Sequence, residues 1–183
     1  PQDREYIGVD HGVEELLKQG ITPKFAIGDF DSLQNRQTLE NLNIQILPER
    51  KDVTDTHAAI DYLLSKGYDE IEIYGATGGR LDHFFAVMCL LEKYQDIKLK
   101  VIDQQNCIQL LKPGIHHIEN KDYYYFSLFA LNESSLSIKQ AEYTLDHYLL
   151  KREDPLCVSN EVKGEYAIIE NSGNILLIQS RDA

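Results

Sequence analysis

The chain has 183 residues, of which 43% are hydrophobic, a length and apolar fraction that suit one good-sized globular domain or two small ones. Its formal net charge of −12 argues against a nucleic-acid partner, because proteins that bind a phosphate backbone carry clustered lysine and arginine. No apolar stretch is long enough to span a bilayer and no basic-then-apolar leader opens the chain, so we expect neither a membrane protein nor a secreted one.

The first hundred residues alternate between short apolar runs and segments with helical spacing. The expected strands are 5–10, 24–29, 44–49, 70–76 and 98–103. The expected helices are 12–20, 36–42, 54–67 and 81–94. Thr54 or Asp55 is a suitable N-cap for the third helix, and Gly67 a suitable stop. Repeated strand–helix alternation predicts a parallel sheet covered by helices on both faces.

The pattern changes near Asn106, after which the sequence shows no convincing helix. The β-rich runs are 108–119, 123–131, 134–145, 155–162, 165–171 and 175–180. Turn signals separate them, as at residues 113–114 and 172–174. We therefore expect an N-terminal parallel-sheet α/β domain at 1–107 and a C-terminal antiparallel β-sandwich domain at 108–183.

The cysteines and histidines give no metal or disulfide pattern. Cys89, Cys107 and Cys157 are far apart and form no C-x-x-C pair, so we expect reduced thiols that fill core space in a cytoplasmic protein. His116 and His117 are adjacent in a predicted strand and should face opposite sides, which makes them poor joint ligands for a metal.

Aspartates follow several of the predicted strands. Asp10 ends the first strand, and Asp29 and Asp31 follow the second in "GDFDS". Asp52 and Asp55 lie between the third strand and its helix. Ligands of open α/β sheets bind outside the carboxyl ends of the strands, so we expect these acids to share one rim. A hard divalent cation such as Mg²⁺ would neutralise their repulsion; the alternatives are an Asx turn and helix capping.

The segment "GATGGRLDH" at residues 75–83 has three glycines in five positions, followed by Arg80. Glycines let backbone N–H groups approach a phosphate closely, and the N-terminus of the next helix favours anions. The planar guanidinium of Arg80 matches phosphate oxygens. The alternative is a plain tight turn, because the sequence has neither a Walker loop nor a G-x-G-x-x-G motif.

Taken together, these motifs resemble the thiamine pyrophosphokinase family. The matching segments, in order, are "VDHG" (9–12), "GITPKFAIGDFDS" (20–32), "KDVTDTHAAIDY" (51–62), "GATGGRLDH" (75–83), "SN" (159–160) and "GNILLIQSRD" (173–182). The resemblance implies an α/β catalytic domain followed by a β domain that binds thiamine. It implies transfer of the diphosphate of ATP to the thiamine hydroxyl, giving thiamine diphosphate and AMP, in a homodimer whose active sites lie at the subunit interface.

Residue roles follow from the resemblance and from the chemistry of phosphoryl transfer, which needs positioning and charge neutralisation. We expect Mg²⁺ at Asp29, Asp31 and Asp52, with Arg80 neutralising charge as AMP leaves. Asp55 is our preferred carboxylate for the attacking hydroxyl. The expected contacts of the nucleotide are Lys51, Thr77, Gly78, Gly79, Arg80, Asp82 and His83. The expected contacts of thiamine are Tyr143, Ser159 and Asn160.

The sequence departs from the family pattern at two places. The family usually begins with one more strand that carries a glycine-rich turn, and the chain, which opens on Pro1, starts after it. The aromatic residue of the β domain, often tryptophan in the family, corresponds to Tyr143 here, since the chain has no tryptophan.

Three other functions remain possible from the residues alone. A phosphatase of the haloacid-dehalogenase type would use the first aspartate of a D-x-D motif as its nucleophile, but Ser32-Leu33 and "IDQQ" do not match the rest of that pattern. A Mg-dependent glycosyltransferase would use D-x-D on a nucleotide sugar. A sensor that binds thiamine or a nucleotide would release no AMP.

Overall fold

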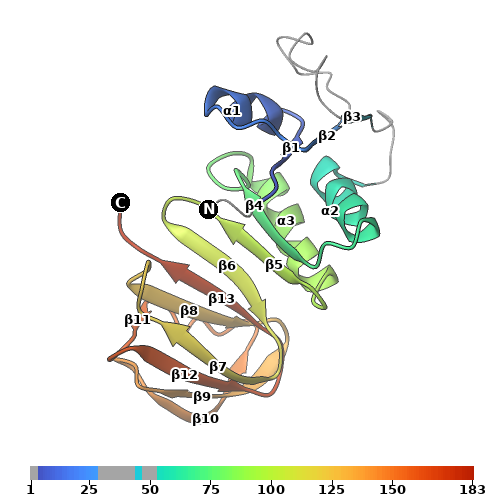
Figure 1. Ribbon diagram of the computed structural model, residues 1–183. Coiled ribbons are helices and arrows are strands. Elements are labelled where there is room, and N and C mark those ends of the chain that lie inside the picture. The colour runs from blue at the N-terminus through green and yellow to red at the C-terminus, as the bar shows by residue number, and fades with distance from the viewer. Residues whose placement is uncertain (1–3, 29–43, 47–52) are drawn as a thin grey trace. The chain divides into compact units, whose positions relative to one another are not determined.

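The structure, a computed structural model, describes residues 4–28, 44–46 and 53–183 of the chain. Two compact units make it up, Pro1–Tyr68 and Asp69–Ala183. Figure 1 shows the helices and strands of each unit. None of the described helices is long and apolar enough to cross a membrane.

The first unit is built on three parallel strands, in the order β1-β2-β3. The strands are β1 (Ile7–Val9), β2 (Phe25–Gly28) and β3 (Ile44–Ile46), and the helices are α1 (Gly12–Lys18) and α2 (Asp55–Ser65). Val13 of α1 and Ala26 and Ile27 of β2 are fully buried. Both faces of β2 thus carry buried or half-buried side chains, as expected of a central parallel strand.

Helix α2 begins and ends at the predicted signals. Thr54 is the N-cap, and its hydroxyl oxygen accepts the N–H of His57 at 3.3 Å. Beyond the last helical residue, Gly67 adopts φ = +88°, the left-handed conformation that stops a helix. The predicted helix at 36–42 lies outside the described residues.

The second unit contains a six-stranded sheet in the order β11-β8-β13-β6-β5-β4. Its strands are β4 (Glu70–Tyr74), β5 (Lys98–Ile102), β6 (Asn106–Leu111), β8 (Tyr125–Ala130), β11 (Asn160–Glu161) and β13 (Ile175–Ser180). Only β4 and β5 are parallel, and helix α3 (Leu81–Lys93) connects them; every other pair is antiparallel.

A four-stranded antiparallel sheet in the order β10-β9-β12-β7 completes the second unit. Its strands are β7 (Gly114–Glu119), β9 (Glu133–Lys139), β10 (Leu145–Lys151) and β12 (Tyr166–Asn171). Alternate side chains of both sheets form one apolar core, which includes Phe126, Leu128, Leu136, Ile169 and Leu177, each at most 1% exposed. Figure 1 shows the two sheets face to face, the arrangement of a β-sandwich.

The predicted fold class is confirmed, with parallel strands in the N-terminal region and antiparallel sheets in the C-terminal one. Parallel strands β4 and β5 share a sheet with the sandwich strands, because β5 pairs with β6 through a tight turn at 103–106. The domain boundary between residues 107 and 108 stays a prediction.

Two expectations need correction. The predicted run 134–145 is interrupted: β9 ends at Lys139, Gln140 has φ = +56°, and a separate strand, β10, begins at Leu145. Cys107 and Cys157 are buried as expected, but Cys89 is exposed on α3 and fills no core space. Burial raises the pKa of the Cys157 thiol to about 11, so this sulfur stays protonated at neutral pH.

Candidate functional site

Asp10 and Gly28 meet where β1 and β2 end. The backbone N–H of Asp10 donates to the carbonyl of Ile27 at 3.0 Å, and Asp10 has φ = +47°. A Cβ atom added at Gly28 would lie 1.9 Å from Oδ1 of Asp10. The carboxylate of Asp10 therefore occupies the space that a side chain at position 28 would need, directly before Asp29 in the sequence.

Asp10 is the functional candidate that sequence reasoning noted as a strand end but gave no role. The signal was available: a glycine before the first aspartate of "GDFDS" allows a close backbone approach. Asp29, Asp31, Lys51 and Asp52, by contrast, lie outside the described residues. Among residues 4–28, 44–46 and 53–183, no three histidine, cysteine or acidic side chains are placed to hold a metal ion.

Asp55 is the first residue of α2, and this helix lies against β1 and β2 within the first unit. Because Thr54 caps the helix, the capping alternative does not require the Asp55 carboxylate. An acidic residue in the first turn is favoured by the helix dipole in any case. Its position is thus compatible with either a structural or a catalytic role.

The glycine loop, residues 75–80, connects β4 to α3 in the second unit. Gly75 and Gly78 have φ = +77° and +80°, conformations that L side chains rarely adopt. A Cβ atom at Gly75, Gly78 or Gly79 would meet no atom of the described residues within 4 Å, so the loop is open to this part of the chain on the side of its glycines. This is the exposed backbone that a phosphate would require.

Arg80 and Asp82 form a two-pronged ion pair at the start of α3. Nε of Arg80 donates to Oδ1 of Asp82 at 3.0 Å, and Nη2 donates to Oδ2 at 2.5 Å. Hydrogen bonds from Arg80, joined by the N–H of His83, lower the pKa of Asp82 to about 2. Both side chains are mostly exposed, at 73% and 63%, so a phosphate can reach the guanidinium.

Asp103, at the end of the neighbouring strand, lies close enough to Thr77 for that side chain to lower its pKa. The carboxylate of Asp103 accepts the N–H groups of Gln105 and Asn106, both at 2.7 Å. Partial burial alone would raise the pKa of Asp103, but these hydrogen bonds lower it overall. Asp103 therefore holds the turn between β5 and β6 and lies beside Thr77 of the glycine loop, a position that sequence reasoning missed.

The three predicted thiamine contacts lie on the sandwich. Ser159 has φ = +57°, and its N–H donates to Oγ of Ser127 at 3.0 Å. The side-chain amide of Asn160, which is 4% exposed, bonds the backbone N–H and carbonyl of Tyr143. Tyr143 is 68% exposed. The structure thus brings Tyr143 and Asn160 into direct contact.

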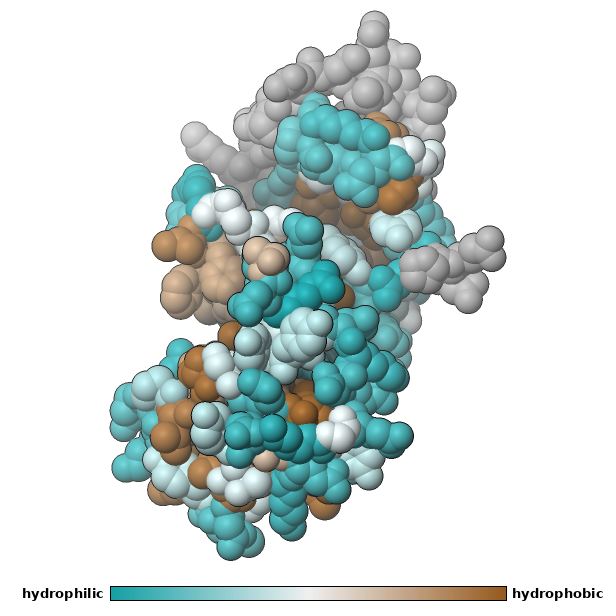
Figure 2. All heavy atoms as spheres, turned by 90° about the vertical axis from the view of Figure 1, so that its left-hand side faces the viewer, coloured by the Kyte–Doolittle hydropathy of each residue, from teal (hydrophilic) through white to brown (hydrophobic). Residues whose placement is uncertain are grey.

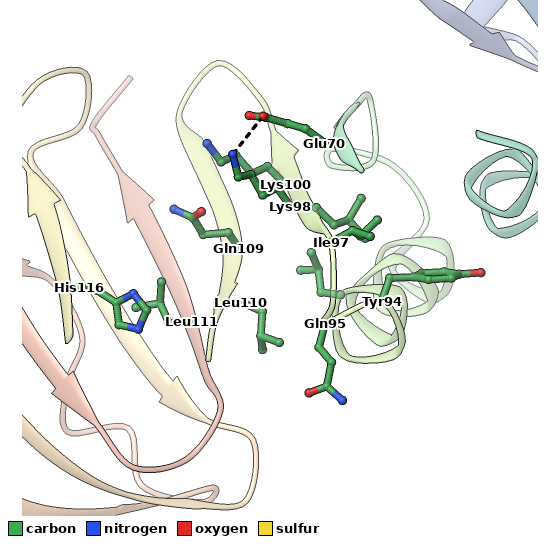
Figure 3. A pocket seen from close by; sticks show the side chains of 12 residues that line it. Glu70, Tyr94, Gln95, Ile97, Lys98, Lys100, Gln109, Leu110, Leu111 and His116 are labelled. Carbon is green, nitrogen blue, oxygen red and sulfur yellow. Dashed lines mark hydrogen bonds and ion pairs between the residues drawn. The ribbon is translucent and has the colours of Figure 1, made fainter. Parts of the chain in front are cut away.

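A surface cavity of about 520 Å³ lies elsewhere in the second unit (Figure 3). It opens where β5 and β6 diverge, since these strands pair only from Lys100 to Ile102 on the β5 side. Glu70 and Lys98, 3.4 Å apart, line it from the first residues of β4 and β5. The glycine loop follows the opposite end of β4, so this cavity is not the predicted nucleotide site.

Comparison with known proteins identifies relatives over almost the whole chain. The model of the "Thiamin pyrophosphokinase, catalytic domain" family matches residues 2–102, and that of the "vitamin B1 binding domain" matches residues 115–176. A thiamine pyrophosphokinase of Bacillus subtilis is 38% identical over 97% of this chain and 87% of its own.

Solved structures agree with the sequence comparison. The crystal structure of the Bacillus subtilis thiamine pyrophosphokinase has a TM-score of 0.89 at 35% identity, covering 98% of this chain and 88% of that one. The corresponding protein from Geobacillus thermodenitrificans has a TM-score of 0.90 at 32% identity, covering 100% and 89%. These two structures share the arrangement of strands and helices described above.

Proposed function

The chain belongs to the thiamine pyrophosphokinase family, and on this premise we propose that it transfers the diphosphate of ATP to the hydroxyl of thiamine. One observation carries the proposal: a catalytic-domain match and a vitamin-binding match follow one another in a single chain. The matches reported above favour this transferase over the phosphatase, glycosyltransferase and sensor alternatives.

The reaction makes one bond and breaks one. The thiamine hydroxyl oxygen attacks the β-phosphorus of ATP, and the bond from that phosphorus to the oxygen bridging it to the α-phosphorus breaks. The bridging oxygen leaves with AMP, and the hydroxyl proton passes to a base, for which Asp55 is our candidate. Arg80 would neutralise the charge that gathers on the leaving AMP.

Mg²⁺ suits the acidic strand ends of the first unit, because carboxylates are the oxygen ligands that it takes. We propose that Asp29, Asp31 and Asp52 hold it. The carboxylate of Asp10 supports this assignment. It packs against Gly28, the residue before Asp29, and so adds a further negative charge there. The bound ion would neutralise charge on the phosphate oxygens of ATP.

We further propose a homodimer with each thiamine pocket shared between two subunits, on the basis of the family resemblance alone.

The open glycine loop, with the guanidinium of Arg80 exposed beside it, supports the assignment of Thr77, Gly78, Gly79, Asp82 and His83 to the nucleotide. Three free thiols are compatible with the proposed cytoplasmic location.

The direct test is incubation with thiamine, ATP and Mg²⁺, followed by chromatographic separation of the products. We expect thiamine diphosphate and AMP in equal amounts. Free phosphate with no AMP would indicate the phosphatase, and binding of thiamine with no product at all would indicate the sensor. A reaction without thiamine serves as the control for simple ATP hydrolysis.

A further inference from the structure

Asn160 connects two parts of the sandwich that are far apart in sequence. Its backbone lies in β11, opposite Phe126 of β8. Its side chain reaches instead to Tyr143: Oδ1 accepts the N–H of Tyr143 at 3.0 Å, and Nδ2 donates to the Tyr143 carbonyl at 2.7 Å. Oδ1 also accepts the N–H of Glu161 at 2.9 Å.

This contact continues a short antiparallel ladder between residues 140–143 and 160–163. The N–H of Lys163 donates to the carbonyl of Gln140 at 2.8 Å, and the N–H of Glu142 donates to the carbonyl of Glu161 at 2.9 Å. At Tyr143 the side-chain amide takes the place of the next peptide group. An amide can do so because it offers one donor and one acceptor in the same geometry as a peptide.

The Asn160 amide is therefore largely used inside the protein. Both lone pairs of Oδ1 accept backbone N–H groups, and the residue is only 4% exposed. Tyr143 differs: its backbone N–H and carbonyl are both hydrogen-bonded, yet the residue as a whole is 68% exposed. Figure 2 looks toward the side of the molecule that carries β11, where hydrophobic residues reach the surface of the sandwich among polar ones.

We propose that Asn160 is a positioning residue that fixes the Tyr143 backbone so that the exposed ring stacks on thiamine. This inference rests on the proposed function and revises the role of Asn160 within it: the amide holds the tyrosine and not the vitamin. An aromatic face suits both rings of thiamine, because it can stack on the aminopyrimidine and attract the cationic thiazolium. Fixing the backbone removes conformational freedom that binding would otherwise have to restrict.

The first experiment converts Tyr143 into a reporter. The chain contains no tryptophan, so Tyr143→Trp introduces a single fluorophore at the proposed stacking position. We expect saturable quenching of its emission by thiamine in the full-length protein. Adding Asn160→Ala should shift the midpoint to about tenfold higher thiamine, the loss expected when one stacked aromatic contact is no longer held. No emission change with thiamine in an active Tyr143→Trp variant would overturn the proposal.

A double-mutant cycle separates positioning from direct binding. Asn160→Ala and Tyr143→Ala should each raise the KM for thiamine by about tenfold, and the double variant should be no worse than Tyr143→Ala alone. The KM for ATP should stay unchanged throughout. If Asn160→Ala raises the thiamine KM further in the Tyr143→Ala background, the amide binds the vitamin itself and the proposal is wrong.

Asn171 provides a matched control. It is also an asparagine 4% exposed in the sandwich, and its Nδ2 donates to the carbonyls of Lys112 and Gly173. Asn171→Ala should leave the thiamine KM unchanged; an increase equal to that of Asn160→Ala would mean general loosening and would overturn the proposal. If Asn160→Ala does not fold, Asn160→Asp, which keeps the oxygen acceptor, replaces it in the same cycle with the same criteria.

The unmodified protein is measured first. If it binds thiamine without forming thiamine diphosphate, the proposed function fails and the cycle is run on the dissociation constant instead. If it binds no thiamine, both proposals are overturned. Additive effects in an active enzyme would reject only the positioning role of Asn160.

Discussion

The glycine at position 28 allows the carboxylate of Asp10 to lie against the end of β2. Two residues that are eighteen positions apart are thereby coupled: any side chain at 28 displaces the acid that follows β1. Asp82 likewise holds the guanidinium of Arg80 in place, and Asn160 holds the backbone of Tyr143. In each case the residue with an evident chemical role is placed by a neighbour whose role only the structure reveals.

We expect Gly28→Ala to destabilise the protein by about 2 kcal/mol, because the new Cβ would meet Oδ1 of Asp10 at 1.9 Å and the backbone has φ = +156°. Urea unfolding measures the change. Gly12→Ala is the matched control: a Cβ there meets nothing within 4 Å, and alanine favours helix α1. Equal stability of the two variants would contradict the packing described here.

The Arg80–Asp82 pair makes a prediction about pH. The pKa of Asp82 is lowered from 3.8 to about 2 by hydrogen bonds from Arg80, so the stabilisation is present above pH 4 and is lost as the pH falls toward 2. NMR titration of the Asp82 carboxyl should give a midpoint near 2 in the native protein and a midpoint shifted up toward 3.8 in Arg80→Ala, where the N–H of His83 still bonds the carboxylate. An unchanged midpoint would show that the pair does not form in solution.

At the scale of whole elements, local sequence signals predicted α2 well and the strand partners poorly. Thr54 and Gly67 mark the ends of α2 through chemistry that acts within a few residues. Strand β10 was missed because a bulge interrupts its alternation between Leu145 and Tyr148, where His147 has φ = +50°. The pairing of β5 with β6 was also missed, since partners depend on contacts that no local pattern records.

The site shows the same division between local and long-range information. Glycine spacing predicted the open loop at 75–80, whereas the acids predicted at 29, 31 and 52 lie outside the described residues and stay a prediction. The bonds from Asn160 to Tyr143 join residues 17 positions apart, and Asp103 lies beside Thr77 although 26 positions separate them. Nothing in the spacing of those residues indicates contact. Only the fold reveals which residue holds each candidate site residue in place.

The loop between β5 and β6 should stabilise the glycine loop through Asp103. Asp103→Ala removes the acceptor for two backbone N–H groups beside Thr77, and we expect a loss of about 1–2 kcal/mol on urea unfolding, with a raised KM for ATP. Asp96→Ala is the control, because within the described part of the chain Asp96 makes only an exposed pair with Lys112, at 2.7 Å. If Asp103→Ala leaves the KM for ATP unchanged, the turn between β5 and β6 does not affect nucleotide binding at the glycine loop.

At the scale of the whole molecule, the proposed shared active site can be tested by mixing two defective proteins. Asp31→Asn is expected to remove activity from the catalytic region, and Tyr143→Ala with Asn160→Ala to weaken thiamine binding in the sandwich. If each site takes its catalytic region from one subunit and its sandwich from the other, a mixed dimer contains one site with both defects and one site with none. Random exchange makes half of the dimers mixed, so about a quarter of the native activity should return at low thiamine concentration.

Light scattering should report a dimer for each protein and for the mixture. Activity that stays at the sum of the two separate variants, or a fully active monomer, would show that every site is built within one chain.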